Sequence, residues 1–351
     1  MNSRPVPAAA ILPSRNEPDT IAAVTTAVDD ALDHPGALII NADSSDHPAT
    51  AQQFAQTPTR ARKISLTGLP RGKGAQILAA LDRLPVSDGP LLIADTDTRT
   101  PDPRIYRALA RAAEPGCAIA DYPRYWDEAN LTSHLARPLI AATTGWDVPQ
   151  PLAGDLALAP STLDILRAAA RGLSADLRSS VNGYGIDAFL LLTAAHAGRI
   201  TSVPLTTPKQ HAASFPHLTD IYHQAVPVLL ALTARWTPPP ASPTARYRTT
   251  DRELTGERLE FMHQVLDQLA SGPAGSDMES WPRHLAEAWH AVRNGTPPHQ
   301  AAAILWPHYI HRVRGWLTPH RSPAQRAAEL TATHARLADH LAARPVWSPH
   351  P

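Results

Sequence analysis

The stretch Leu91-Leu92-Ile93-Ala94-Asp95-Thr96-Asp97 ends an apolar run with two carboxylates one residue apart. A short apolar run predicts a parallel strand that is buried on both faces, and open α/β sheets bind their ligands at the carboxyl ends of such strands. Side chains two residues apart in an extended chain point the same way, so Asp95 and Asp97 can face one hard cation. The alternative is a simple turn, because Asp and Thr also favour turns.

The composition excludes several classes of protein. The chain of 351 residues carries 32 basic and 32 acidic residues, which argues against a nucleic-acid-binding protein with its usual basic excess. Cys117 is the only cysteine, so the sequence offers no disulfide framework and no CxxC zinc site. No signal-peptide pattern is present, and no apolar run approaches the roughly 18 residues of a membrane span. We therefore expect a cytoplasmic protein.

Short apolar runs alternate with segments of helical period in the first half of the chain, which predicts an α/β fold with a mostly parallel sheet flanked by helices. Asp19 is expected to cap the first helix, and Cys117 lies in a predicted strand. We predict strands over residues 8–12, 37–40, 63–66, 90–94, 117–120 and 200–205.

The chain is more helical beyond residue 130, and prolines after residue 236 end a long predicted helix. We therefore predict three segments. They are a sheet domain that binds the substrate over residues 1–236, a Pro-rich linker over 237–250 and a helical C-terminal region over 251–351.

Three polar clusters follow predicted strands, at residues 14–17, 43–46 and 95–97. Because the carboxyl ends of parallel strands share one edge of a doubly wound sheet, we expect these clusters to lie side by side. Asp43 and Ser44 can accept hydrogen bonds from a base or a ribose, as the acidic residue of a Rossmann site does. An Asx-turn explains the same two residues equally well.

Lys73 lies between Gly72 and Gly74 at the start of a predicted helix, and the chain has only two other lysines. Glycines permit close backbone approach, a helix N-terminus favours an anion, and a lysine adds a point charge for phosphate. We prefer this phosphate-binding interpretation to that of a solvated loop lysine. The spacing is not that of a Walker A loop, and a GxGxxG motif is absent, so neither ATP hydrolysis nor NAD binding is supported.

Two further residues carry candidate chemistry. His211 follows the last predicted strand and can complete the coordination of a manganese-type cation held by Asp97, although a lone histidine is more often solvated or structural. Asp187 opens an apolar helix, where it either favours the helix dipole or orients a substrate hydroxyl. Nucleophilic catalysis is disfavoured, because no GxSxG elbow is present and Cys117 lies in a predicted buried strand.

In their order along the chain, these residues resemble the glucosyl-3-phosphoglycerate synthases, which are retaining glycosyltransferases with a glycosyltransferase A fold and are related to mannosylglycerate synthases. The likeness covers about residues 8–235, and the helical C-terminal region is similar to a lesser degree. The matching motifs are Pro13…Glu17, Asp43-Ser44, Gly72-Lys73-Gly74, Asp95-Thr96-Asp97, Ala136-Arg137-Pro138-Leu139, Gln150-Pro151-Leu152-Ala153-Gly154 and Tyr184-Gly185-Ile186-Asp187.

The resemblance implies a Rossmann-like, glycosyltransferase A-type sheet and roles for individual residues. Lys73 and Asp187 would be the catalytic residues, and Asp187 stands where the family has a glutamate. The metal, Mn²⁺ or Mg²⁺, would be bound by Asp97 and His211 with Asp95. The nucleotide sugar would contact Pro13, Glu17, Asp43, Ser44, Lys73, Asp95 and Thr96. The acceptor would contact Asn130, Thr132, Gly154 and Tyr184.

The chain departs from the family at the expected acceptor site. Where the family has Gly-Arg-Val-Thr, with the arginine on the phosphate of 3-phosphoglycerate, this chain has Ala129-Asn130-Leu131-Thr132. Ala213 also replaces a family asparagine, and the segment over residues 171–182 is longer. Because a neutral amide cannot supply a bidentate cation, we predict an acceptor other than 3-phosphoglycerate.

We predict a homodimeric, metal-dependent retaining glycosyltransferase that moves glucose from a UDP-linked donor to a hydroxyl of a small polar acceptor. The metal would act as a Lewis acid on the leaving diphosphate, with Lys73 or Arg71 assisting. Two alternatives stay open: a sugar-phosphate nucleotidyltransferase, and a non-catalytic nucleotide-sugar-binding protein. The segment Pro13-Ser14-Arg15-Asn16-Glu17 favours glycosyl transfer, because nucleotidyltransferases usually have a glycine-rich loop there.

Overall fold

The computed structural model describes residues 8–85, 89–113, 115–210, 215–240, 245–270, 279–318 and 321–343. The chain forms two compact units. The first comprises Met1–Tyr122 with Gln150–Ala225, and the second comprises Pro123–Pro149 with Val226–Pro351. These units differ in extent from the three contiguous segments expected from the sequence, because an internal segment belongs with the C-terminal helices.

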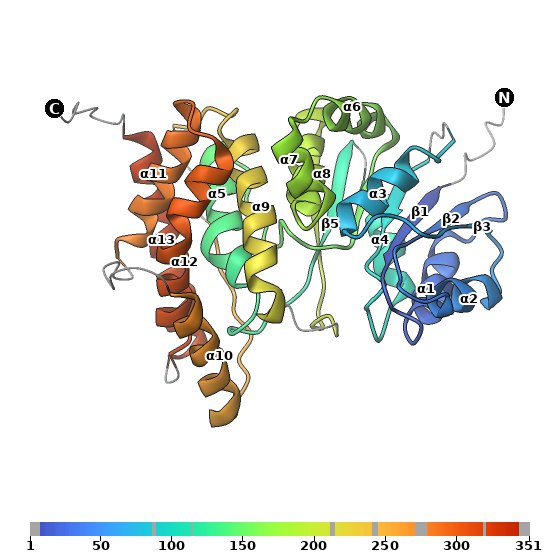
Figure 1. The fold of residues 1–351 in the computed structure, drawn as a ribbon, viewed down its shortest axis with the longest axis horizontal. Helices are drawn as coiled ribbons and strands as arrows, with labels where there is room; N and C mark the ends of the chain where they lie inside the picture. Colours follow the sequence, from blue (N-terminus) through green and yellow to red (C-terminus); the bar gives the residue numbers. More distant parts are fainter. Residues whose placement is uncertain are drawn as a thin grey trace. The chain divides into compact units, whose positions relative to one another are not determined.

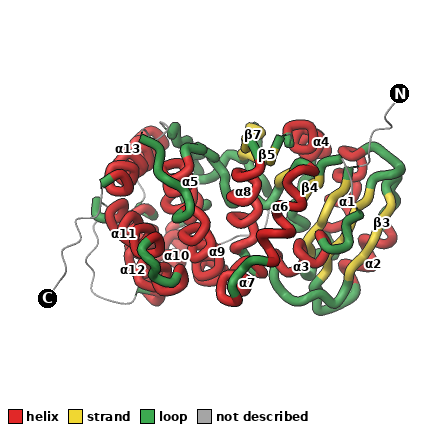
Figure 2. The backbone as a smooth tube through the Cα atoms, turned by 90° about the horizontal axis from the view of Figure 1, so that it is seen from above, coloured by secondary structure: helices red, strands yellow, loops and turns green. Residues whose placement is uncertain are grey.

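The first unit is built on one mixed sheet with strand order β3-β2-β1-β4-β6-β5-β7 (Figures 1 and 2). The β3, β2, β1 and β4 strands pair in parallel, as do β5 and β7, whereas β6 is antiparallel to both of its neighbours. The strands are β1 (Ala9–Ser14), β2 (Leu38–Asp43), β3 (Arg62–Leu66), β4 (Leu91–Ile93), β5 (Gly116–Asp121), β6 (Leu156–Leu158) and β7 (Arg199–Pro204). Because β6 runs in the opposite direction, its beginning lies at the edge of the sheet where β4 ends.

Helices pack on this sheet in two groups. In the first group, α1 (Ile21–Leu32) and α4 (Pro103–Ala112) pack against each other, and α2 (Ala49–Gln56) lies on β2 and β3. Their apolar side chains share one core with residues of the central strands, including Ala10, Leu12, Ile39, Leu92, Ala118 and Ala157.

In the second group, α3 packs on β1 and β2, α8 packs on β5 and β7, and α7 contacts both α3 and α8. The α6 helix also packs on α8. The helices of this group are α3 (Lys73–Leu81), α6 (Pro160–Arg171), α7 (Ala175–Asn182) and α8 (Gly185–Ala197). Figure 1 shows α6, α7 and α8 as one group. The start of α3 therefore lies near the junction of α7 and α8.

The predicted α/β fold with a mostly parallel sheet is confirmed, and each predicted strand overlaps an observed one. The β6 strand and the α7 helix were not predicted. The expected cap at Asp19 is wrong: Thr20 is the N-cap residue of α1, and no side chain caps that helix. Asp19 therefore lies one residue outside the position from which a side chain normally caps a helix.

The second unit is helical among its described residues. A π-helix over Thr132–Ala136 continues into α5 (Arg137–Thr144), and α13 (Pro323–Ala342) packs on α5 and on α11 (Trp281–Arg293). The remaining helices are α9 (Leu218–Thr233), which begins in the first unit, α10 (Gly256–Leu269) and α12 (Pro298–Trp316). No described helix is long and apolar enough to cross a lipid bilayer.

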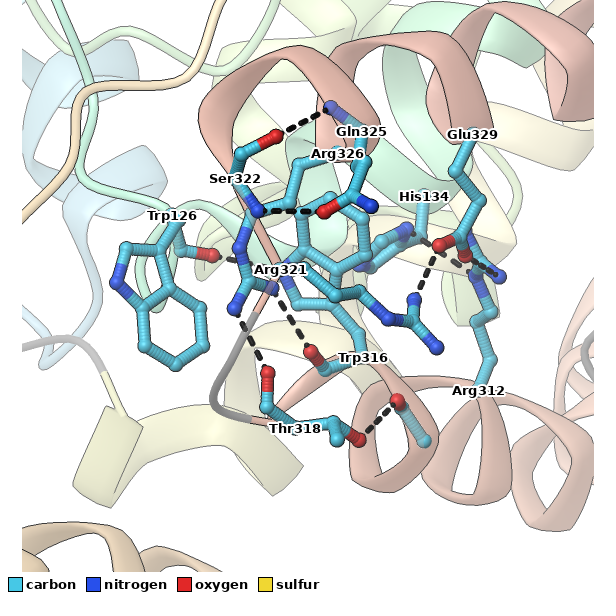
Figure 3. A network of polar contacts seen from close by, with 11 residues as sticks. Trp126, His134, Arg312, Trp316, Thr318, Arg321, Ser322, Gln325, Arg326 and Glu329 are labelled. Atoms are coloured by element: carbon cyan, nitrogen blue, oxygen red, sulfur yellow. Dashed lines mark hydrogen bonds and ion pairs between the residues drawn. The ribbon is translucent and has the colours of Figure 1, made fainter.

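A polar and aromatic network holds the segment before α5 on the C-terminal helices (Figure 3). The guanidinium of Arg326 lies 3.7 Å from the centre of the Trp126 ring and donates to the carbonyl of Trp316 at 3.1 Å. The indole of Trp316 donates in turn to the carbonyl of Trp126 at 2.7 Å, and Arg312 Nε lies 3.3 Å from His134 Nδ1. These contacts explain why residues 123–149 belong to the second unit.

Candidate functional site

The carboxyl ends of β1, β2 and β4 come together at one edge of the sheet. The register places Ser14 opposite Asp43, and the backbone N–H of Ser44 donates to the carbonyl of Ser14 at 3.0 Å. Thr96, which follows β4, donates its hydroxyl to the carbonyl of Pro13 at 2.7 Å. The three polar clusters predicted to lie side by side are therefore joined by hydrogen bonds.

Asp43 and Ser44 are both buried and hydrogen-bonded within the protein. Asp43 Oδ1 accepts the backbone N–H of Ser45 at 2.8 Å, which is the turn chemistry weighed against a nucleotide contact. Gln76 of α3, which sequence reasoning missed, donates to Ser44 Oγ at 2.7 Å and to the carbonyl of Ser14 at 2.6 Å. Gln76 thus fixes the ends of β1 and β2, and the contact of Asp43 with a nucleotide stays a prediction.

Lys73, the first residue of α3, forms two ion pairs. Its Nζ lies 2.9 Å from Asp95 Oδ1 and 2.9 Å from Asp187 Oδ1. The three side chains are mostly buried, with exposed fractions of 17% for Lys73, 25% for Asp95 and 12% for Asp187. The structure therefore brings together three of the predicted site residues from α3, from the end of β4 and from the start of α8.

A second lysine, Lys209, completes this group from the segment after β7. Its Nζ lies 2.8 Å from Asp95 Oδ2 and 2.8 Å from Asp155 Oδ2, and the side chain is 2% exposed. Asp155 also accepts the backbone N–H of Asp95 at 2.9 Å and the hydroxyl of Tyr122 at 2.6 Å. We call Lys73, Asp95, Asp155, Asp187 and Lys209 the lysine–aspartate cluster.

The charges of the cluster shift its pKa values. Burial alone would raise the pKa of Asp95, but Lys209 and Lys73 outweigh burial and hold that pKa well below its usual range. Burial raises the pKa of Asp187 to about 6 although Lys73 opposes the rise, and the charge of Asp95 adds to it. Two ammonium groups face three carboxylates, and Asp187 retains its proton to higher pH than an exposed aspartate does.

The glycines beside Lys73 have a role that the sequence did not reveal. A Cβ atom at Gly74 would lie 1.7 Å from the carbonyl oxygen of Val181, and one at Gly72 would lie 2.3 Å from that of Asn182. The backbone N–H of Gly74 donates to the carbonyl of Gly183 at 3.2 Å. The predicted close backbone approach is therefore made to the α7–α8 junction of the same chain, which places Lys73 against Asp187.

Gly154 and Tyr184, predicted as acceptor contacts, both border the cluster. A Cβ atom at Gly154 would lie 2.0 Å from Asp95 Oδ2, so only glycine leaves room for this carboxylate. The backbone N–H of Tyr184 donates to Gln224 Oε1 at 2.8 Å, and burial raises the pKa of the Tyr184 hydroxyl. Their contact with an acceptor stays a prediction.

The predicted metal ligands are placed only in part. His211 lies outside the described residues, and the described part of the chain contains no group of three or more His, Cys, Asp or Glu side chains arranged for a metal ion. Both oxygens of Asp95 are within ion-pair distance of a lysine, so in this arrangement Asp95 does not fit the role of metal ligand predicted for it.

Asp97 interacts electrostatically with Glu17, and the segment before His211 contacts the chain beside it. Burial raises the pKa of Glu17, a hydrogen bond from Thr20 opposes the rise, and the charge of Asp97 adds to it. Carboxylate oxygens are among the donors that a hard divalent cation prefers. The ammonium group of Lys209 contacts Asp95, and the backbone carbonyl of Gln210 accepts the backbone N–H of Arg99 at 3.0 Å. The two residues that precede His211 thus contact the chain on either side of Asp97.

Asn130 and Thr132, the other predicted acceptor contacts, are buried in the second unit. Asn130 Nδ2 donates to the carbonyl of Asp127 at 3.2 Å, whereas Asn130 Oδ1 accepts no hydrogen bond from the described residues. Ala129 before it has φ of 54°, which L-residues rarely adopt, and the π-helix begins at Thr132. Their binding of an acceptor stays a prediction.

Sequence reasoning missed Asp155 and Lys209, although each has a signal. Asp155 follows Gly154, which was identified, and Lys209 is one of only three lysines in the chain and precedes His211 by two residues. Cys117 is fully buried, and burial raises the pKa of its thiol to about 12. A thiol with so high a pKa is a poor nucleophile near neutral pH.

Comparisons with known proteins bear on the fold. No protein-family model matches the sequence, and no curated protein matches it. The structure is similar to that of glucosyl-3-phosphoglycerate synthase from Mycobacterium tuberculosis in complex with Mg²⁺ and uridine diphosphate, with a TM-score of 0.51, 21% identity, and coverage of 72% of this chain and 85% of that chain. The complex of that enzyme with Mn²⁺, uridine diphosphate and phosphoglyceric acid gives a TM-score of 0.50, 21% identity, and coverage of 72% and 84%.

A third complex of the same enzyme, with Mn²⁺, uridine diphosphate and glucosyl-3-phosphoglycerate, gives a TM-score of 0.50 at 22% identity and covers 67% of this chain and 82% of that chain. At this level of identity the likeness concerns the fold. The chain therefore has a glycosyltransferase A-type fold, and the resemblance predicted from the sequence is confirmed at the level of architecture.

Proposed function

We propose that the chain is a divalent-metal-dependent retaining glycosyltransferase that moves a hexose from a nucleoside diphosphate sugar to a hydroxyl of a small polar acceptor. UDP-glucose is the expected donor, because structures of the same fold hold uridine diphosphate with Mg²⁺ or Mn²⁺. The acceptor is expected to differ from 3-phosphoglycerate, because Asn130 provides no cation for its phosphate. The homodimer and the cytoplasmic location remain predictions.

One observation carries this proposal. Lys73 lies at the carboxyl edge of the sheet, between Asp95 and Asp187 at 2.9 Å each, next to the joined ends of β1, β2 and β4. Open α/β sheets bind nucleotides at this edge, and an ammonium group there can bind a diphosphate. The cation is placed by an ordered network within the protein, so little freedom is lost when a donor binds.

The metal is proposed to be held by Asp97 and His211, while Asp95 stays with the lysines. When bound, such an ion acts as a Lewis acid on the diphosphate oxygens. Lys73 would add charge stabilisation on the leaving diphosphate. Asp187, next to Lys73 and mostly buried, would orient a hydroxyl of the sugar or of the acceptor.

The proposal is tested by incubating the protein with UDP-glucose, Mn²⁺ and a mixture of small polyols and hydroxy acids. The products distinguish the candidate functions. Release of uridine diphosphate together with a glycosylated acceptor supports glycosyl transfer. In a separate assay with UTP and glucose 1-phosphate, release of pyrophosphate supports a nucleotidyltransferase. Binding of UDP without turnover of any acceptor supports a non-catalytic binding protein.

The Asp97→Asn variant tests the metal assignment. We expect it to lose at least about a hundredfold of the Mn²⁺-dependent rate, because the amide removes a charged ligand of the ion. Asp164→Asn is the matched control, since its carboxylate is 95% exposed on α6 and outside the cluster. Full metal-dependent activity of Asp97→Asn would show that Asp97 is not a ligand.

A further inference from the structure

Lys209 is the more buried of the two lysines in the lysine–aspartate cluster. The side chain is 2% exposed, and Asp155, one of its two partners, is fully buried. Its ammonium also lies 5.6 Å from the centre of the Tyr122 ring, within the range of a cation–π contact. An ammonium group with so little access to solvent cannot itself bind an incoming substrate. Lys209 must therefore act through the carboxylates that it contacts.

The partners of Lys209 connect it to Lys73. Asp95 is the shared carboxylate: Oδ2 lies 2.8 Å from Lys209 Nζ, and Oδ1 lies 2.9 Å from Lys73 Nζ. On its remaining side, Asp95 is bounded by Gly154, where a Cβ atom would approach its carboxylate to 2.0 Å. Lys209 and Gly154 thus fix the plane of this carboxylate, and the carboxylate fixes the position of Lys73.

We infer that Lys209 is a positioning residue, which holds Asp95 in the orientation that directs the ammonium group of Lys73 to the diphosphate of the donor. This inference rests on the proposed function for the identity of the ligand. It assigns Asp95 to the two lysines rather than to the metal. Removing Lys209 would free one oxygen of Asp95, allow the carboxylate to rotate and displace Lys73.

Nuclear magnetic resonance tests the positioning without any nucleotide. The chain has three lysines, so protein labelled with [¹⁵N]lysine gives at most three ammonium signals. We expect Lys209→Met to remove one signal and to shift that of Lys73. Lys63→Met is the matched control: Lys63 donates to the carbonyl of Phe54 at 2.7 Å, at the end of α2, and its loss should leave the Lys73 signal in place.

A double variant separates positioning from a purely structural role. Lys209→Met alone leaves Asp155 buried without its cation, which can destabilise the fold. Combining Lys209→Met with Asp155→Asn removes both charges, and the amide oxygen at residue 155 can still accept the backbone N–H of Asp95. If Lys209 acts only in folding, the double variant returns the Lys73 signal and the affinity for UDP to their wild-type values.

Our inference predicts the opposite result. In the double variant the Lys73 signal stays shifted, and the dissociation constant for UDP with Mn²⁺ increases by about ten- to a hundredfold, because a misplaced charge loses much of its effect. An unchanged Lys73 signal in a folded Lys209 variant would overturn the inference. If wild-type protein binds no UDP while the Lys209→Met substitution shifts the Lys73 signal, the proposed function fails and the positioning role of Lys209 stands.

Discussion

Asp187 is unusual among the acidic residues of the site, because burial raises its pKa to about 6 although an ammonium group lies 2.9 Å away. The folded protein therefore keeps this proton at pH values where the unfolded chain, with a pKa of 3.8, has lost it. Since the folded state binds more protons in this range, Asp187 makes the free energy of unfolding smaller as the pH rises from about 4 to about 6.

The Asp187→Asn variant tests this effect. Because the amide does not titrate, the free energy of unfolding of wild type minus that of the variant should decrease by up to about 3 kcal/mol from about pH 4 to about pH 6 and stay constant above. Urea denaturation over this range measures it, with Asp164→Asn as the control for the loss of a charge. A difference that does not change with pH would contradict the ionisation assigned to Asp187.

At the level of elements, the start of α3 depends on two glycines. A Cβ atom at Gly74 would lie 1.7 Å from the carbonyl oxygen of Val181, which is shorter than any distance between non-bonded atoms. The Gly74→Ala substitution must therefore displace α3 from the α7–α8 junction. We expect this variant to lose about 1–3 kcal/mol of stability, the usual effect of overpacking, and to weaken UDP binding because Lys73 moves with the helix.

The Gly172→Ala variant is the matched control for Gly74→Ala. Gly172 has φ of −81°, and its nearest neighbour would lie 3.6 Å from the new Cβ atom. This variant should therefore retain the stability and the UDP affinity of wild type in thermal unfolding and calorimetry. If Gly74→Ala behaves in the same way as Gly172→Ala, the close contact between α3 and α7–α8 does not hold.

The elements also show what could be predicted from the sequence. Apolar runs with polar ends, such as residues 90–97, predict both a buried strand and the edge where a ligand binds, because local pattern and tertiary position agree there. The β6 strand is antiparallel to both of its neighbours, and this direction depends on long-range pairing that no local pattern reveals. Asp155 could not be placed next to Asp95 without that direction, so this member of the lysine–aspartate cluster stayed hidden.

The glycines beside Lys73 also depend on tertiary contacts that the sequence does not reveal. A glycine in a sequence can mark a position where another group approaches closely, but it does not identify that group. The phosphate interpretation of Gly72 and Gly74 considered only a ligand, whereas the carbonyl groups of Asn182 and Val181 occupy that space.

At the scale of the whole molecule, the chain passes between the two units at residues 122–123, 149–150 and 225–226. A sequence divided into consecutive segments cannot reveal such an arrangement. Trp126 and His134 contact Trp316, Arg326 and Arg312, which come almost 200 residues later. The C-terminal helices are therefore needed to complete the packing of an internal segment.

This arrangement predicts the behaviour of a truncated chain. A chain that ends at residue 250, the predicted end of the linker, keeps residues 123–149 but loses α10–α13, and it should expose the apolar face of α5. We expect it to aggregate or to unfold without a cooperative transition, as measured by size-exclusion chromatography and calorimetry. A monomeric truncated chain with a sharp unfolding transition would show that residues 1–236 form an independent domain.

The central claim is that Lys73, held between Asp95 and Asp187, binds the diphosphate of a nucleotide. Isothermal titration of UDP in the presence of Mn²⁺ tests it most directly, with wild type, Lys73→Met and Lys63→Met compared at one ionic strength. We expect Lys73→Met to increase the dissociation constant by about ten- to a hundredfold, since one charge-assisted hydrogen bond contributes about 1.5–3 kcal/mol. Lys63→Met should bind as wild type does. Equal affinities for wild type and Lys73→Met, or no binding by wild type, would contradict the claim.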